Sequence, residues 1–219
     1  MIFILKKTDI LRVGRRLRPR GSYKKTSITI HSTANDSSSA ENERRWLDNP
    51  SNKRNASWHY VVGEGVVIQA TPDSEEAWHS GVPEGNKYSI GIELIESGDR
   101  KNVLETAAEF IAEKLKEHSL SMDDIKCHFD WTGKNCPRIL IDNKYIKEGM
   151  NLEYFKKRIE KYFFEEKIIP EECRIKINGK EYFVERVFIN DTNYIKVRDF
   201  EKAGFKISYE GDMAILNTP

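Results

Sequence analysis

Alternation of apolar and polar residues predicts several β-strands in the first half of the chain. Residues 26–32, TSITIHS, alternate isoleucine with small polar residues and reach His31 at the end of the run, a pattern typical of a strand. Residues 57–72, SWHYVVGEGVVIQATP, hold two β-rich runs around a Gly-Glu-Gly turn and predict a hairpin. Residues 88–96, YSIGIELIE, place apolar residues at every second position and predict a further strand.

Other segments carry apolar residues at helical spacing. Residues 37–48 begin with serines that can cap a helix and carry acids in its first turn. Residues 103–118 and 152–163 each place their apolar side chains on one helical face. Because strands interleave with helices, we expect an α/β fold with a mixed central β-sheet flanked by helices.

The pattern changes near residues 167–173, where the helical spacing stops at Pro170. The runs that follow are short and β-rich, with one short helical stretch. The sequence therefore predicts two units: a larger domain over residues 1–166 and a small β-rich (α+β) module over residues 174–219.

Charge is distributed unevenly along the chain. Its 219 residues, 38% of them apolar, are enough for an ordinary core, and the formal net charge is +1. Residues 1–30, however, carry nine Lys or Arg against Asp9 alone, a local charge of +8. Such a basic arm favours a polyanion such as nucleic acid, anionic lipid or an acidic wall polymer, or it is simply a solvated segment.

Export and membrane signals are weak. The opening MIFIL is too short for the core of a signal peptide, and no window approaches the roughly 20 apolar residues of a membrane span. We therefore expect synthesis in the cytoplasm without a signal peptide. Three scattered cysteines make a disulfide framework improbable, which leaves thiols for metal binding.

Residues 127–137, CHFDWTGKNCP, are open to three interpretations: a redox pair, a crosslink or part of a metal site. Neighbours in an extended segment face opposite sides, so Cys127 is a bystander if His128 points into a cleft. A loop through Gly133 can bring His128 and Cys136 together. A catalytic zinc site needs three protein ligands, and His31 offers a third. On spacing alone, a lone histidine or cysteine is more often a core residue than a metal ligand.

Four motifs in register resemble the type-2 N-acetylmuramoyl-L-alanine amidases, a zinc family that includes phage endolysins and bacterial autolysins. They are ITIHSTAN (28–35), WHYVVGEGVVIQATPDSEEAWHSG (58–81), SIGIELIES (89–97) and CHFDWTGKNCP (127–137). The resemblance covers about residues 20 to 160. It implies a central sheet with packed helices and a groove that holds one Zn²⁺ per chain.

The resemblance also implies roles for individual residues. His31, His128 and Cys136 match the three zinc ligands. Glu93 matches the catalytic glutamate, with Glu96 as the fallback, and Lys134 matches the lysine that stabilises the oxyanion of the tetrahedral intermediate. His79 and Trp58 fall beside the substrate groove. Some relatives have a catalytic tyrosine at the position of Trp58, and tryptophan has no phenolic proton to give.

The last 46 residues resemble, more loosely, the copper-amine-oxidase-type N-terminal (stalk) domain of Gram-positive surface proteins. The matching features are an NGK turn, the run NYIKVRDF and the AGF that ends the short helix. The module contains no histidine, so copper chemistry is not expected. Wall-polymer binding and homodimerisation are both open as its function.

These features predict a zinc amidase that cleaves the bond between N-acetylmuramic acid and L-alanine in bacterial peptidoglycan. A phage or prophage endolysin, released to the cell wall by a membrane-permeabilising partner, fits the expected lack of a leader. The competing hypotheses are a cytoplasmic amidase that recycles soluble muropeptides and a non-catalytic peptidoglycan-binding protein. A nucleic-acid binder is favoured by nothing beyond residues 1–30.

Overall fold

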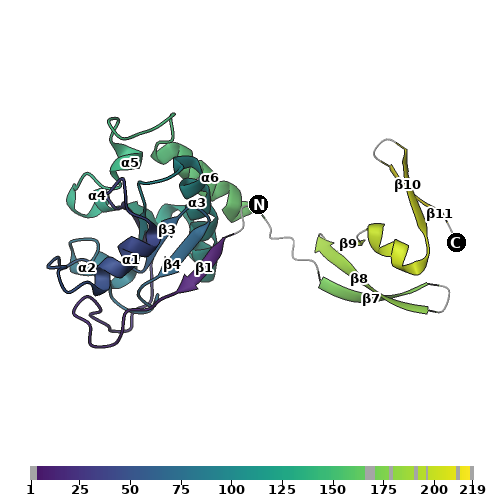
Figure 1. The fold of residues 1–219 in the computed structure, drawn as a ribbon, viewed down its shortest axis with the longest axis horizontal. Coiled ribbons are helices and arrows are strands. Elements are labelled where there is room, and N and C mark those ends of the chain that lie inside the picture. Colours follow the sequence, from purple (N-terminus) through teal and green to yellow (C-terminus); the bar gives the residue numbers. More distant parts are fainter. Residues whose placement is uncertain are drawn as a thin grey trace. The chain divides into compact units, whose positions relative to one another are not determined.

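The first of two compact units, residues 1–165, is built around one six-stranded sheet (Figure 1). The computed structural model describes residues 4–165, 171–177, 180–189, 192–195, 197–210 and 213–217. The strand order is β1-β4-β3-β5-β2-β6, and every neighbouring pair is parallel except the β3–β4 hairpin. The strands are β1 (Leu5–Thr8), β2 (Ser27–Ser32), β3 (Tyr60–Gly63), β4 (Val66–Gln69), β5 (Ser89–Leu94) and β6 (Ile125–Cys127). The predicted mixed sheet is confirmed.

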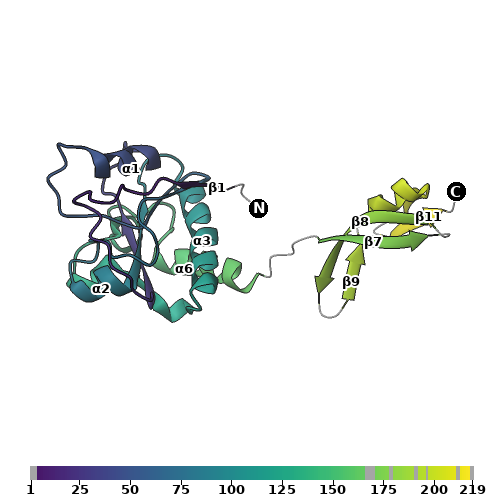
Figure 2. The ribbon, with the colours of Figure 1, turned by 90° about the horizontal axis from the view of Figure 1, so that it is seen from below.

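Helices α1 and α3 pack against this sheet, and Figure 2 shows α6 beside α3. The longest, α3, lies on β3, β4 and β5 and packs along α6, while α4 and α5 contact β2. Side chains of Ser39, Asp99 and Asn151 cap the starts of α1, α3 and α6. The helices are α1 (Ala40–Asp48), α2 (Pro83–Tyr88), α3 (Arg100–Glu117), α4 (His128–Thr132), α5 (Arg138–Ile141) and α6 (Leu152–Phe164), with a 3₁₀ turn at Met122–Asp124.

Strand β2 lies between two parallel neighbours, and all six of its residues are buried. Ile28 and Ile30 are fully buried in the core. The alternating Thr29 lies among polar groups: its hydroxyl is 2.6 Å from that of Ser89 and accepts a hydrogen bond of 2.9 Å from the Trp131 indole. Thr29 and His31 point to the same face of β2, and this face is therefore polar and buried.

The structure corrects the expectation that residues 1–30 form a free basic arm. Strand β1 joins the sheet beside β4, and many of the basic side chains have partners within the unit. Lys7 bonds Glu41 at 2.8 Å, Arg15 bonds Asp48 at 2.9 Å and Arg18 bonds Glu75 at 2.5 Å. The Lys25 ammonium is buried and donates to two backbone carbonyls at 2.8 Å. The sequence could not show this, because the partners lie far along the chain.

The second compact unit, residues 166–219, is β-rich among its described residues. Antiparallel strands β7 (Glu171–Ile177), β8 (Lys180–Ile189) and β9 (Thr192–Ile195) form one sheet, and β10 (Lys206–Glu210) pairs with β11 (Met213–Asn217). A 3₁₀ helix spans Val197–Ala203, and the buried Asp199 accepts a 2.8 Å hydrogen bond from the Glu185 amide.

Some sequence predictions fall on residues outside the description. Residues 166–170, at the predicted boundary, and Asn178 and Gly179 of the NGK motif are among them. The resemblance to a stalk domain stays a prediction. Within the ranges given above, no helix has both the length and the apolar character that crossing a bilayer requires.

Candidate metal centre and substrate groove

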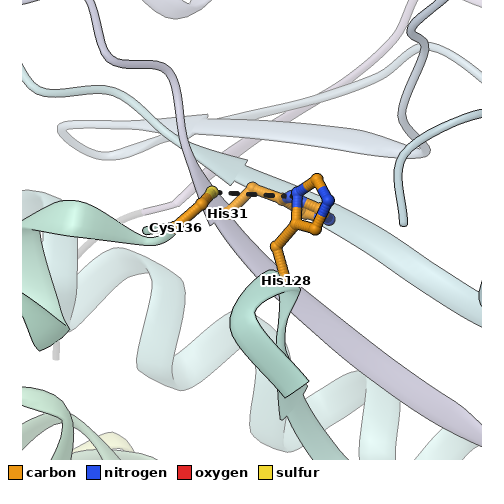
Figure 3. Close-up of side chains that lie close together, drawn as sticks. All are labelled: His31, His128 and Cys136. Carbon is orange, nitrogen blue, oxygen red and sulfur yellow. Dashed lines mark hydrogen bonds between the residues drawn. The ribbon is translucent and has the colours of Figure 1, made fainter. Parts of the chain in front are cut away.

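Three side chains from separate segments converge at the carboxyl ends of β2 and β6 (Figure 3). His31 lies near the end of β2, His128 is the first residue of α4 directly after β6, and Cys136 precedes α5. Because β2, β5 and β6 are parallel, their carboxyl ends meet at one edge of the sheet, where α/β proteins commonly bind ligands.

The donor atoms lie at distances suited to one shared ion. His31 Nδ1 is 3.1 Å from His128 Nδ1 and 3.7 Å from Cys136 Sγ, and all three donor atoms lie within 4.8 Å of one another. Tetrahedral zinc with ordinary bond lengths separates two nitrogens by about 3.3 Å and a nitrogen from a sulfur by about 3.6 Å. Two imidazoles and one thiol, all buried, are a donor set typical of zinc. The residues therefore fit the metal that the sequence predicts.

A short helix and a closed turn bring His128 and Cys136 together. The Cys127 amide donates to Asp130 at 2.7 Å at the start of α4, and Gly133, with a φ of 72°, ends the helix. The Phe129 amide then donates to the Cys136 carbonyl at 3.0 Å and closes the turn. His128 is thus in a helix, not at the strand end that the sequence suggested. Cys127 is buried, outside the ligand cluster.

Burial sets the protonation states of the ligands. Desolvation lowers the pKa of His31 well below its usual value, and the pKa of His128 falls to about 4 through burial and the charge of Lys134. Both imidazoles are therefore neutral at pH 7, as metal ligands must be. Burial and then the nearby Glu93 raise the pKa of the Cys136 thiol to about 12. A bound cation reverses that preference, so metal binding at Cys136 releases a proton.

Glu93 lies beside the cluster on the neighbouring strand. It pairs in register with His31, so both side chains point to the same face, while Ile92 and Leu94 are fully buried on the other. Its Oε2 atom is buried and meets no hydrogen-bond partner in the described part of the chain. Burial, and next the charge of Glu43, raise the pKa of Glu93 to about 8, whereas Lys134 acts in the opposite direction.

A groove of two lobes surrounds these residues. The larger lobe has a volume of about 610 Å³ and the smaller about 440 Å³, and Trp58, Glu93 and Lys134 line both. His31, His79 and His128 line the smaller lobe, and Cys136 lines the larger. The lining of the larger lobe also includes Asn42, Glu43, Trp46, Arg54 and Arg138.

Two further polar atoms in the groove walls have no hydrogen-bond partner among the described residues. They are the indole Nε1 of Trp58 and the hydroxyl of Ser32, and both residues are 7% exposed. Lys134 is exposed on the turn between α4 and α5. Trp58 and Lys134 thus line the same groove as Glu93, and their roles stay predictions.

His79 lines the smaller lobe of the groove and also lies against the His31 ring, and its contact with substrate stays a prediction. Its Nδ1 is 3.0 Å from His31 Nε2, and the two rings meet edge to face with centroids 5.1 Å apart. His59 is buried in the next layer, where Nδ1 accepts from the Gly91 amide at 2.9 Å and Nε2 donates to the Glu75 carbonyl at 3.0 Å. His59 is therefore structural.

Sequence reasoning missed Asn86. Its Oδ1 accepts hydrogen bonds from the amides of His79 and Ser80, each at 2.9 Å, and from the Ser80 hydroxyl at 3.0 Å. One side chain thereby fixes the turn that carries His79. An asparagine seven residues from a histidine carries no sequence signal, because only the folded turn brings them together.

A second cluster of possible metal ligands, Asp73, Glu117 and His118, is already neutralised. The Lys114 ammonium lies 2.9 Å from Asp73 and 2.7 Å from Glu117, and the His118 ring lies 2.9 Å from Asp73. A lysine thus occupies the place that a cation would take.

Residues 22–139, more than half of the chain, match the family model described as N-acetylmuramoyl-L-alanine amidase. The chain is similar to N-acetylmuramoyl-L-alanine amidase CwlA of Bacillus subtilis (strain 168), at 40% identity over 134 residues, 58% of this chain and 48% of that protein. It is similar to N-acetylmuramoyl-L-alanine amidase CwlH of the same organism, at 33% identity over 144 residues, 63% of this chain and 57% of that protein. The chain thus spans about half the length of these relatives.

Among solved structures, the catalytic domain of XlyA aligns with a TM-score of 0.63 at 33% identity, over 71% of this chain and 99% of that structure. The segment matched by the family model contains His31, Glu93, His128 and Cys136. With its metal-binding geometry and its catalytic-domain fold both in place, this chain belongs to the N-acetylmuramoyl-L-alanine amidase family.

Proposed function

We propose that the chain is a zinc-dependent peptidoglycan hydrolase that cleaves the amide between N-acetylmuramic acid and the L-alanine of the stem peptide. The observation that carries this proposal is the convergence of His31, His128 and Cys136 beside Glu93, whose buried Oε2 atom has no hydrogen-bond partner among the described residues. Family membership supports the choice of bond, because the relatives are named for that reaction.

His31, His128 and Cys136 would hold the metal. When bound, zinc supplies Lewis acidity, which polarises a carbonyl and lowers the pKa of water and, through its charge, of Glu93. Glu93 accepts the proton of the attacking water at Oε2, the atom that has no protein partner. It later returns that proton to the nitrogen of the departing L-alanine.

Lys134 and Trp58 complete the reaction site. The Lys134 ammonium lines both lobes and stabilises the negative charge that develops on the scissile carbonyl oxygen. Trp58 cannot supply a phenolic proton, but its buried indole N–H has no hydrogen-bond partner in the described part of the chain and can hydrogen-bond substrate. The two lobes on either side of these residues offer room for the glycan and the peptide.

The wider biology is also part of this proposal. An endolysin or autolysin acting on the cell wall fits the relatives better than an amidase that recycles soluble muropeptides. Contact between residues 1–30 and anionic wall polymer stays a prediction, weakened by the internal ion pairs of that segment. Homodimerisation or wall binding through residues 174–219 stays a prediction too.

Zinc content and lysis of purified cell walls test the function together. Cys136→Ser should lose zinc and lysis, and Glu93→Gln should keep zinc but lose lysis. Digestion should release new L-alanine amino termini without new reducing sugars. Reducing ends would indicate a glycosidase, and wall binding without digestion would indicate a non-catalytic binder. Faster turnover of soluble muropeptides than of intact walls would support the recycling hypothesis.

A further inference from the structure

His31 uses both nitrogens of its ring, and only one of them faces the metal centre. Nδ1 faces His128 and Cys136, at 3.1 and 3.7 Å, whereas Nε2 lies 3.0 Å from Nδ1 of the buried His79. A neutral imidazole carries its proton on one nitrogen only. The group opposite Nε2 therefore decides whether Nδ1 has a lone pair available for a metal.

His79 has a defined tautomer because a carbonyl faces its other nitrogen. His79 Nε2 lies 3.3 Å from the Ser89 carbonyl oxygen, which can only accept, so Nε2 carries the proton. Neither ring nitrogen of His79 bonds a carboxylate, so nothing compensates an imidazolium at this buried position. In the neutral ring Nδ1 is an acceptor, and His31 Nε2 must be the donor.

We propose that His79 is a positioning residue that fixes the tautomer of His31. The Ser89 carbonyl sets the proton of His79, His79 sets the proton of His31 on Nε2, and His31 Nδ1 is left with a lone pair directed at His128 and Cys136. This inference rests on the metal centre of the proposed function and adds to it a residue that touches neither metal nor reacting atoms.

The surroundings of His79 hold its ring in place. Asn86 binds the backbone of His79 and Ser80. On the other side the ring packs against Gly91 of β5, where an added Cβ would lie 2.5 Å from His79 Cγ. Only glycine at position 91 leaves room for the His79 imidazole. Strand β5 therefore accommodates the ring that orients His31 on the neighbouring strand β2.

The same turn serves the second histidine ligand. His128 Nδ1 faces His31 at 3.1 Å, whereas its Nε2 lies on the side of this turn. Its Nε2 also lies near Gly81, 3.7 Å from where a Cβ would stand. Both imidazoles thus lie against residues 79–81 and present Nδ1 to a common point.

The wild-type protein without metal provides the first test. Long-range ¹H–¹⁵N NMR of its histidine rings reports which nitrogen carries the proton. We expect a protonated Nε2 and an unprotonated Nδ1 for both His31 and His79. A proton on His31 Nδ1 would overturn the proposal, and this outcome does not depend on zinc binding or activity.

Variants of His79 provide the second test, with zinc affinity measured by competition against a chromophoric chelator. His79→Leu removes the acceptor, and we expect a loss of about 10- to 100-fold in affinity, the usual effect of removing such a support. His79→Gln retains an acceptor and a donor and should recover part of that loss. His59→Gln is the matched control: it alters a buried imidazole that packs on His79 but does not bond His31.

The outcomes separate the two proposals. If His79→Leu binds zinc like the wild type and keeps the proton on His31 Nε2, the role of His79 is refuted. If His59→Gln weakens zinc as much as His79→Leu, the effect is one of packing, and the role of His79 is again refuted. If the wild-type protein shows the expected tautomers but binds no zinc, the proposed function fails while the assignment of the His31 and His79 tautomers stands. Should His79→Leu not fold, the wild-type spectrum decides alone.

Discussion

Arg138 holds the carboxylate of Glu96 with two of its nitrogens: Nε lies 3.0 Å from each Glu96 oxygen, and Nη2 lies 2.6 Å from Oε2. The Glu96 side chain is 3% exposed and also accepts a 3.1 Å hydrogen bond from the Ala34 amide. Arg138 follows Cys136 by two residues, and Glu96 follows the end of β5 by two. This ion pair therefore links the segment that contains Cys136 to the end of β5. Glu96 is thus committed to structure and is not available as the fallback base.

The first prediction contrasts the two glutamates. Glu93→Gln should reduce wall hydrolysis by at least 10²-fold, because it removes the proposed general base, while the midpoint of thermal unfolding changes little. Glu96→Gln should retain most of the activity per folded molecule and lower the free energy of unfolding by roughly 2 kcal/mol, less than a fully buried pair because Arg138 is partly exposed. The reverse pattern in paired activity and denaturation assays would exchange their roles.

The second prediction concerns the exposed Lys134. Lys134→Met should lower kcat by roughly 10²- to 10³-fold, the usual loss when a group that stabilises an oxyanion is removed. Zinc affinity should stay the same or rise, because the charge of Lys134 lowers the pKa of His31 and His128 and so repels cations at the same place. Kinetics and zinc titration of the same preparation check both. A variant that loses zinc would show that Lys134 supports the metal site instead.

The third prediction concerns Gly91. Gly91→Ala should displace the His79 ring, since the new Cβ would stand 2.5 Å from it, and should weaken both stability and zinc binding. Gly14→Ala is the control: it has a φ of +88° but nothing within 4 Å, so only backbone strain is added. Zinc affinity should fall for the first variant and stay unchanged for the second. Equal zinc affinities in the two variants would mean that displacing the His79 ring does not affect zinc binding.

The fourth prediction concerns Trp58. Trp58→Phe keeps an aromatic ring in the groove wall but removes the unpartnered indole N–H. If that N–H contacts substrate, kcat/KM should fall by roughly tenfold, the value of one hydrogen bond, with zinc content unchanged. An unchanged kcat/KM on peptidoglycan fragments would assign Trp58 to packing.

The fifth prediction concerns acid stability and Asp73. Burial raises the pKa of Asp73, but hydrogen bonds from Tyr60, His118 and Lys114 outweigh it, so the folded pKa lies below the usual value. The unfolded state therefore binds more protons, and the contribution of Asp73 is complete above about pH 4 and is lost as the pH falls through its folded pKa. Asp73→Asn should lower stability at pH 7 and flatten its decline below pH 4. Denaturation curves that keep the same acid slope would contradict this.

The sequence already contained the main elements of the fold. The alternation in residues 26–32 and 88–96 corresponds to β2 and β5, and the helical spacing of residues 103–118 and 152–163 corresponds to α3, which ends one residue earlier at Glu117, and to α6. These predictions succeed because periodicity depends on neighbours in the chain and on which face is buried. The motifs likewise pointed to His31, His128 and Cys136, since their order and residue chemistry are visible without coordinates.

Contacts between distant residues were decided by the tertiary structure alone. Residues 1–30 looked like a free basic arm until folding supplied Glu41, Asp48 and Glu75 as partners. His79 was expected beside the substrate groove, and its additional contact with His31 depends on the packing of its ring against Gly91. Glu96 was the fallback for Glu93 in the sequence, and the fold brings Arg138 against it. Local sequence determines whether a segment is strand or helix, whereas the partner of a polar side chain depends on strand register and helix packing, which only the whole fold defines.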